Sequence, residues 1–185
     1  MKKMLLFLLL FSIHNILAPS VGIKPDVDRI LKEREYNKLY NEVITSLKSF
    51  EGLMLETYSC PAGYKTIGYG HLIRPSDRFP SVITESAADS LLRADFDVSV
   101  NEVQRLAGYS QYEDPAKLLA LAHFVFNMGS VKFERSTLLS MIKVGKPIKY
   151  ELMKWVHYRD SDSTVVVSSN LKRMRNYEVN LFYSS

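Results

Sequence analysis

Apolar residues recur at helical spacing in the stretch that ends at residue 50. The positions, separated by three or four residues, are Tyr40, Val43, Ile44, Leu47 and Phe50. This spacing predicts an amphipathic helix packed on a core. A carboxyl follows directly, because Glu51 lies between Phe50 and Leu53. Apolar neighbours of this kind withdraw water from a carboxyl and favour its protonated form, so Glu51 is a candidate proton donor.

The pattern changes to short alternating stretches after Glu51. Residues 53–58 and 64–69 alternate, and between them Pro61 and Gly63 suit turn positions. The sequence therefore predicts a β-hairpin with Cys60 in its first turn and Thr66 on the returning strand. A hairpin in this place is expected to turn both side chains toward one cleft beside Glu51.

Further helices are predicted beyond the hairpin. Thr84 is a good cap for a helix through Leu91, Phe96 and Val103, and Pro115 opens another helix that ends at residues 126–129. Basic residues outnumber acidic ones across residues 143–175, which fits a solvated helical face or attraction to an anionic cell envelope.

The N-terminus has the order of an export signal. Two lysines precede an apolar stretch and then small residues, so we expect residues 1–22 to be a signal peptide or, alternatively, a weak membrane anchor that is not cleaved. Its removal would lower the formal net charge from +4 to +2, since Lys2 and Lys3 leave with no acidic residue. Residues 23–39 are expected to be a charged linker or short helix, and residues 40–185 one domain. Export would place the protein in the periplasm or outside the cell.

Three residues carry the candidate chemistry, at the spacing E-x8-C-x5-T: Glu51, Cys60 and Thr66. Hydrolysing an acetal needs a proton donor near the leaving oxygen and a means of holding water behind the sugar. The run FEGLMLETYSCPAGYKTIGYGH, residues 50–71, resembles the active-site segment of the phage-type lysozymes, the endolysins of glycoside hydrolase family 24. In that family the motif is Glu, then Asp or sometimes Cys, then Thr, at the same two spacings.

The resemblance implies an α+β fold with a small β-hairpin lobe and a larger helical lobe, joined by the long helix that begins near Thr84. It extends to residues 171–178, where Arg173, Arg175 and Glu178 fit the family's terminal basic helix. It also implies that the active site lies between the lobes and that the substrate is bacterial peptidoglycan, which these enzymes cut. Glu51 would protonate the leaving oxygen while Cys60 and Thr66 position a water. A retaining route, in which Cys60 itself attacks the anomeric carbon, stays open.

Cys60 stands where most members of the family have Asp. It is the only cysteine of the chain, so an intramolecular disulfide is excluded by counting. A free cysteine is otherwise a small buried apolar residue, and a neutral thiol positions water poorly. Two other functions therefore remain alternatives: a peptidoglycan-binding protein with impaired catalysis, and a lytic transglycosylase that adds no water.

Three more residues are candidates for contact with the sugars. The FNMG segment, residues 126–129, resembles the end of a family helix that contacts substrate, so Asn127 is either a sugar-binding amide or a helix cap. Tyr69 and His71 follow Thr66 in the hairpin, and His71 is also interpreted as structural, closing the hairpin by hydrogen bonds. We expect no metal, cofactor or nucleic acid, because four scattered histidines supply no ligand spacing and no aromatic motif accompanies the basic residues. A monomer is expected, with weak contact to an anionic envelope or membrane through the N-terminus.

Overall fold

The computed structural model describes residues 26–59, 63–159 and 164–184. Residues 1–22 and Cys60, to which the sequence assigns export and chemistry, lie outside them. The chain divides into two units, Met1–Leu31 and Lys32–Ser185, and the architecture below is that of the second. Among the described residues, no helix combines the length and the apolar character that crossing a membrane requires.

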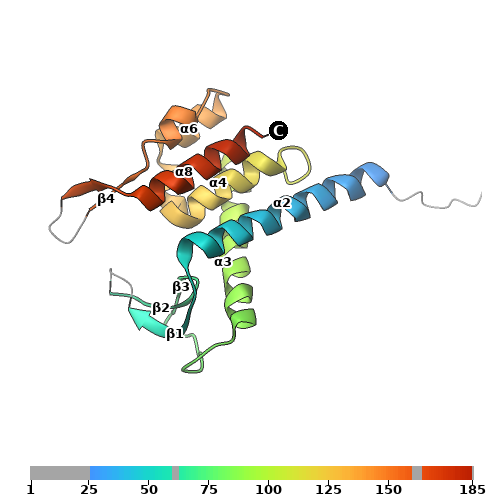
Figure 1. Cartoon of the computed structure of the whole chain (residues 1–185). Helices are drawn as coiled ribbons and strands as arrows, with labels where there is room; N and C mark the ends of the chain where they lie inside the picture. Colours follow the sequence, from blue (N-terminus) through green and yellow to red (C-terminus); the bar gives the residue numbers. More distant parts are fainter. Residues whose placement is uncertain (1–25, 60–62, 160–163, 185) are drawn as a thin grey trace, which may run out of the picture. The chain divides into compact units, whose positions relative to one another are not determined.

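The unit from Lys32 onward has an α+β fold, as predicted. Its helices are α2 (Val27–Glu51, which begins in the first unit), α3 (Glu85–Ala107), α4 (Pro115–Met128), α5 (Ser130–Glu134), α6 (Thr137–Lys143), α7 (Lys149–Leu152) and α8 (Ser169–Phe182). Its strands are β1 (Met54–Ser59), β2 (Lys65–Gly68), β3 (His71–Leu72), β4 (His157–Arg159) and β5 (Val165–Val167). The first three strands form one antiparallel sheet in the order β1-β2-β3, and β4 pairs with β5 in a separate hairpin (Figure 1).

Helix α2 ends at Glu51, the candidate proton donor. Val43, Ile44 and Leu47 are buried on it, which confirms the predicted amphipathic helix. Gly52 follows the last helical residue with a φ of 75°, a left-handed conformation that glycine adopts without strain. Its N–H bonds the carbonyl of Lys48 at 3.2 Å. The helix therefore stops at Glu51, and the chain turns at once into β1.

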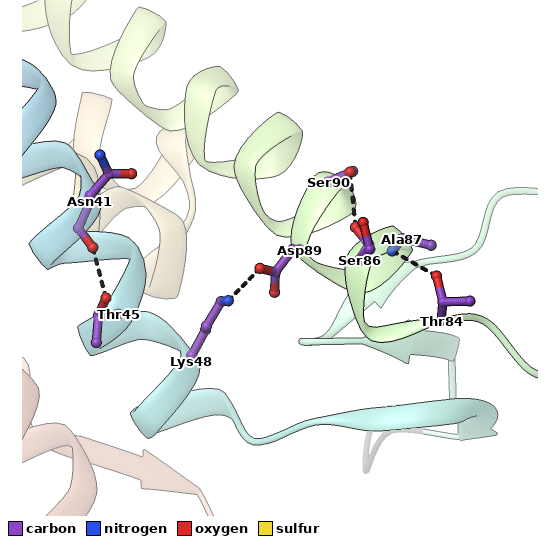
Figure 2. Close-up of polar contacts among 8 residues, drawn as sticks. All are labelled: Asn41, Thr45, Lys48, Thr84, Ser86, Ala87, Asp89 and Ser90. Carbon is purple, nitrogen blue, oxygen red and sulfur yellow. Dashed lines mark hydrogen bonds and ion pairs between the residues drawn. The ribbon is translucent and has the colours of Figure 1, made fainter.

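Helix α3 connects the sheet to the other helices. Thr84 caps it as predicted, since its Oγ1 accepts a hydrogen bond from the N–H of Ala87 at 3.1 Å (Figure 2). One part of α3 contacts β2 and β3, and another contacts α4, α5 and α6 (Figure 1). The apolar side chains between these contacts, including the fully buried Phe96, form one continuous core.

Helix α4 is the centre of the helical lobe. Residues 116 and 118–125 are all buried, because α3 and α8 pack against it (Figure 1). A helix that is apolar on nearly every side is stable only in such a position. The predicted helices beginning at Pro115 and covering residues 171–178 are thus confirmed as α4 and α8. The hairpin of β4 and β5 is a feature that sequence periodicity did not indicate, since each of its strands has only three residues.

An ion pair joins α2 to α3 beside the sheet. The ammonium of Lys48 contacts the carboxylate of Asp89, and both side chains are about 30% exposed (Figure 2). The same ammonium lies 5.7 Å from the centre of the Tyr69 ring. Lys48 therefore links α2, α3 and the turn between β2 and β3, one helical turn before Glu51.

Gly68 is a point of close approach between β2 and α3. It has a φ of 68°, and a Cβ added there would lie 3.3 Å from the Cβ of Ala88. Gly108 has a similar φ of 78° with open space around it. We expect Gly108→Ala to lower the free energy of unfolding by about 1–2 kcal/mol through backbone strain alone. Gly68→Ala should cost about 2–4 kcal/mol, because overpacking adds to the strain.

Urea unfolding of both variants measures the difference. Equal losses would show that the sheet and α3 separate freely enough to accept a methyl group, and the close packing of β2 on α3 would then not constrain the fold.

Candidate functional site

A cleft of about 390 Å³ opens where the sheet, α3 and the end of α4 meet; we call it the Glu51 cleft. Its described lining residues are Glu51, Tyr69, Gly70, His71, Leu72, Arg74, Asp95, Val98, Ser99, Glu102, Val125, Phe126, Asn127, Gly129 and Ser130. These residues come from four separate stretches of the chain. Glu51 and the three candidate sugar-contacting residues of the sequence are all among them.

Glu51 presents its carboxyl to this cleft from the last position of α2. Its side chain is exposed on the cleft side, yet the surrounding protein removes enough water to raise the pKa of the carboxyl, an effect that the nearby His123 partly opposes. The C-terminal end of a helix also disfavours negative charge. A carboxyl that keeps its proton beside an open cleft is suited to general acid catalysis.

Two cleft residues come from the turn into β3. Tyr69 is 6% exposed and anchors the turn against Lys48. His71 pairs with Ile67 in the sheet register, and its Nδ1 lies 2.8 Å from Oδ2 of Asp95 on α3. The ring of His71 therefore lines the cleft while its Nδ1 is held by α3. This geometry agrees with a structural role in closing the hairpin and leaves a contact with sugar open.

Asn127 lines the Glu51 cleft from the last turn of α4. Its Oδ1 accepts a hydrogen bond from Nη2 of Arg175 at 3.1 Å, and no described residue bonds its amide nitrogen. The helix end itself is closed by Gly129, whose N–H bonds the carbonyl of Val125 at 2.7 Å. The side chain of Asn127 is thus not a cap, and it faces the cleft with N–H groups available to donate.

A buried ionic cluster lies behind this wall of the cleft. His123, Arg175 and Glu178 are each 0% exposed. Oε1 of Glu178 accepts hydrogen bonds from Nδ1 of His123 and from Nη2 of Arg175, both at 2.8 Å. Nε of Arg175 lies 2.8 Å from Oε2 of the same carboxylate, although it is not aligned as a hydrogen bond. Burial raises the pKa of Glu178, and its interactions with His123 and Arg175 act against that rise.

This cluster is the part of the site that sequence reasoning missed. The sequence indicates Arg175 and Glu178 only as members of a basic helix, and His123 only as one of four scattered histidines. A signal was present, because His123 interrupts an apolar run from residue 118 to residue 126. An ionisable group in such a run needs a buried partner.

The remaining motif residues are placed differently. Thr66 lies on β2, is 5% exposed, and donates its hydroxyl to the carbonyl of Tyr58 at 3.4 Å. It is not among the described residues that line the cleft. Cys60 lies outside the described part of the chain. The structure thus brings Glu51, Tyr69, His71 and Asn127 to one cleft, and the roles of Cys60 and Thr66 stay predictions. Within the described ranges, no group of three or more His, Cys, Asp or Glu could hold a metal ion.

Comparison with known proteins gives this geometry a context. Residues 48–178 match the family model described as phage lysozyme. The chain is 32% identical over 145 residues to an endolysin of Acyrthosiphon pisum secondary endosymbiont phage 1, covering 75% of this chain and 93% of that protein. It is 35% identical over 148 residues to an endolysin of Bacillus phage B103, covering 75% of this chain but only 51% of that relative, so it spans about half the relative's length.

A solved structure shows the same fold. The muramidase domain of SpmX from Asticaccaulis excentricus superposes with a TM-score of 0.68 at 29% identity. The match covers 78% of this chain and 96% of that domain.

The raised pKa of Glu51 predicts a dependence of stability on pH. Because the folded state favours the protonated carboxyl, this contribution is complete below the ordinary pKa of 4.5 and is lost as pH rises through the higher folded value. Glu51→Gln cannot ionise, so we expect it to gain stability relative to the wild type as pH rises to neutrality. Urea unfolding across this pH range tests the expectation, with Glu56→Gln, exposed on β1, as the control. A constant difference between wild type and Glu51→Gln would contradict it.

The buried cluster predicts a large effect of one substitution. Arg175→Met leaves the Glu178 carboxylate without its guanidinium, and we expect the free energy of unfolding to fall by about 3–5 kcal/mol. Adding Glu178→Gln removes the unpaired charge and should recover much of the loss. Denaturant unfolding measures both variants, and Lys172→Met, which removes an exposed cation from the same helix, is the control. A loss no larger than that of the control would mean that the cluster contributes little.

Proposed function

The chain belongs to the phage lysozyme family of glycoside hydrolases, and we propose that it hydrolyses the β-1,4 bond between N-acetylmuramic acid and N-acetylglucosamine in bacterial peptidoglycan. The observation that carries the proposal is the carboxyl of Glu51, held at the end of α2 with a raised pKa and open to a cleft. A general acid must carry a proton and must reach a large substrate. Burial raises the pKa of the Glu51 carboxyl and so favours its protonated form, and the carboxyl lines an open cleft.

In the proposed reaction, Glu51 donates its proton to the glycosidic oxygen as the bond from that oxygen to the anomeric carbon breaks. The carboxylate formed is then near His123, whose positive charge, when present, favours it. Asn127 can donate a hydrogen bond to a sugar from the far wall, because Arg175 already occupies its carbonyl oxygen. Tyr69 and His71 form the wall beside Glu51.

The second half of the reaction is assigned to Cys60 and Thr66. A water held on the opposite face of the sugar bonds the anomeric carbon and gives up its proton, and solvent returns a proton to Glu51. Cys60 as a thiolate would accept the proton of that water, and the hydroxyl of Thr66 would help to hold it. The support for these roles is the spacing of the two residues relative to Glu51 in the family motif, which the chain keeps.

The products released from purified peptidoglycan test the proposal. We expect the protein to release fragments that end in reducing N-acetylmuramic acid, identified by mass spectrometry. Glu51→Gln should lower the rate by at least about 100-fold, the usual contribution of a general acid. Glu56→Gln, which removes an exposed carboxylate outside the cleft, should keep the rate.

Other products would point to the alternatives. Fragments with anhydro ends would identify a transglycosylase, and wall binding without any release would identify a binding protein. The configuration of the first product, followed by NMR, separates the two hydrolytic routes. Inversion fits a water held by Cys60 and Thr66, whereas retention fits direct attack by Cys60.

A further inference from the structure

His123 is a fully buried ionisable side chain to which the proposed reaction gives no step of its own. It lies in α4, where residues 118–125 are all buried and the other side chains are apolar. An imidazole in such surroundings costs free energy that an apolar side chain would not. The hydrogen bond between its Nδ1 and Glu178 offsets part of this cost. The rest of its surroundings relates it to Glu51.

The imidazole ring packs against the last turn of α2. Its centroid lies 5.7 Å from that of Phe50, in an edge-to-face contact, and 5.1 Å from that of Tyr177 on α8. Phe50 directly precedes Glu51, so the histidine lies close behind the residue that presents its carboxyl to the Glu51 cleft. His123 does not line this cleft. Any action of His123 on the reaction therefore passes through Glu51 and not through contact with substrate.

The buried groups around His123 leave a positive charge on it unbalanced. Glu178 is the only buried carboxylate of the described residues, and Nε of the buried Arg175 lies 2.8 Å from it. One negative charge thus serves two groups that can be positive. Nε2 of His123 also has no hydrogen-bond partner within the described part of the chain. Because charges interact strongly where water is excluded, a protonated His123 acts on the next carboxylate available, that of Glu51.

The pKa of Glu51 gives the direction of this action. Burial raises the pKa of the carboxyl, and positive charge on His123 lowers it. The two influences are opposed because burial favours the neutral acid, whereas a nearby cation favours the carboxylate. Without His123 the acid would hold its proton more firmly.

Other ionisable groups face this region from three sides. They are Arg173, Arg175, Tyr177 and Glu178 on α8, His71 and Arg74 in and after β3, and Asp95 and Glu102 on α3. Several are already paired, His71 with Asp95 and Glu102 with Arg105. Besides burial, His123 is the influence on the pKa of Glu51 that the described residues supply.

We propose that His123 is a positioning residue of the general acid, whose positive charge behind α2 sets the acid strength of Glu51 and so the pH range of activity. The inference rests on the proposed function, since that function makes Glu51 the donor. In the reaction the proton leaves Glu51 for the glycosidic oxygen, and His123 keeps its own protons. Its charge stabilises the carboxylate that this transfer forms.

The dependence of kcat/KM on pH tests the role. His123→Gln removes the charge, and its amide can still donate a hydrogen bond to Glu178. We expect the alkaline limb of the profile to move to higher pH, because Glu51 then keeps its proton longer. At a pH where the wild type has lost nine-tenths of its maximum, the variant should retain about threefold more of its own maximum, or greater. A purely structural role would lower the rate at every pH and leave the limb in place, which would overturn the inference.

A matched control removes another imidazole. His157 on β4 is exposed and does not line the Glu51 cleft. His157→Gln should leave the alkaline limb where the wild type has it. An equal movement of the limb in the two variants would contradict a specific action of His123.

A measurement on the wild type needs no substitution. Nitrogen-15 NMR of the imidazole shows whether both ring nitrogens of His123 carry protons at the pH of maximum activity, as the inference requires. A ring with a single proton there would overturn it, whether or not His123→Gln folds.

Carbon-13 NMR of the Glu51 carboxyl separates the inference from the proposed function. Its titration should lie at higher pH in His123→Gln than in the wild type. If this difference is found in a protein that cuts no peptidoglycan, the proposed function fails and the action of His123 on Glu51 stands. If the wild type cuts peptidoglycan and the titration is the same in both proteins, the inference fails alone.

Discussion

A single buried carboxylate, that of Glu178, holds the helical lobe and one wall of the cleft together. It lies between His123 of α4 and Arg175 of α8, and none of the three side chains has contact with solvent. A carboxylate in such surroundings is tolerated only with partners at hydrogen-bond distance, so the packing of α4 on α8 is constrained to keep His123 and Arg175 beside Glu178. The guanidinium of Arg175 extends the same constraint to Asn127. The orientation of a cleft amide therefore depends on a charge that substrate never touches.

The same cluster bears on Glu51. His123 lies near enough to influence the pKa of the catalytic candidate, and its ring packs edge-on against Phe50, the residue before Glu51. Burial and the helix end favour the protonated carboxyl, whereas positive charge on His123 favours the carboxylate. A general acid has to pass between these two forms. The position of Glu51 between a desolvating wall and a buried histidine gives the protein a physical means of supporting both.

The end of α4 borders two hollows, the Glu51 cleft and a second one lined by Met128 and Trp155. Gly129 breaks the helix with a φ of 88° and a ψ of 144°, and the residues on either side of it face alternate hollows. The side toward the Glu51 cleft carries the amide of Asn127, and the other side carries the side chain of Met128.

The sequence by itself determined what depends on neighbouring residues. The spacing of Val43, Ile44 and Leu47 predicted the part of α2 that leads to Glu51, and Thr84 and Pro115 marked the starts of α3 and α4, because caps and apolar periods act within a few residues. The motif that begins at Glu51 identified the family. Its spacing also predicts that Cys60 and Thr66 act with Glu51, and that prediction rests on the sequence alone.

Only the tertiary structure decided what depends on distant residues. Glu178 meets His123 across 55 positions of the chain, and His71 meets Asp95 across 24, through helices whose packing no local pattern specifies. The hollow lined by Met128, Arg135 and Trp155 arises in the same way, from segments that are separate in sequence and adjacent in space. Local propensities act over a few residues, whereas these contacts are set by how whole helices pack against one another.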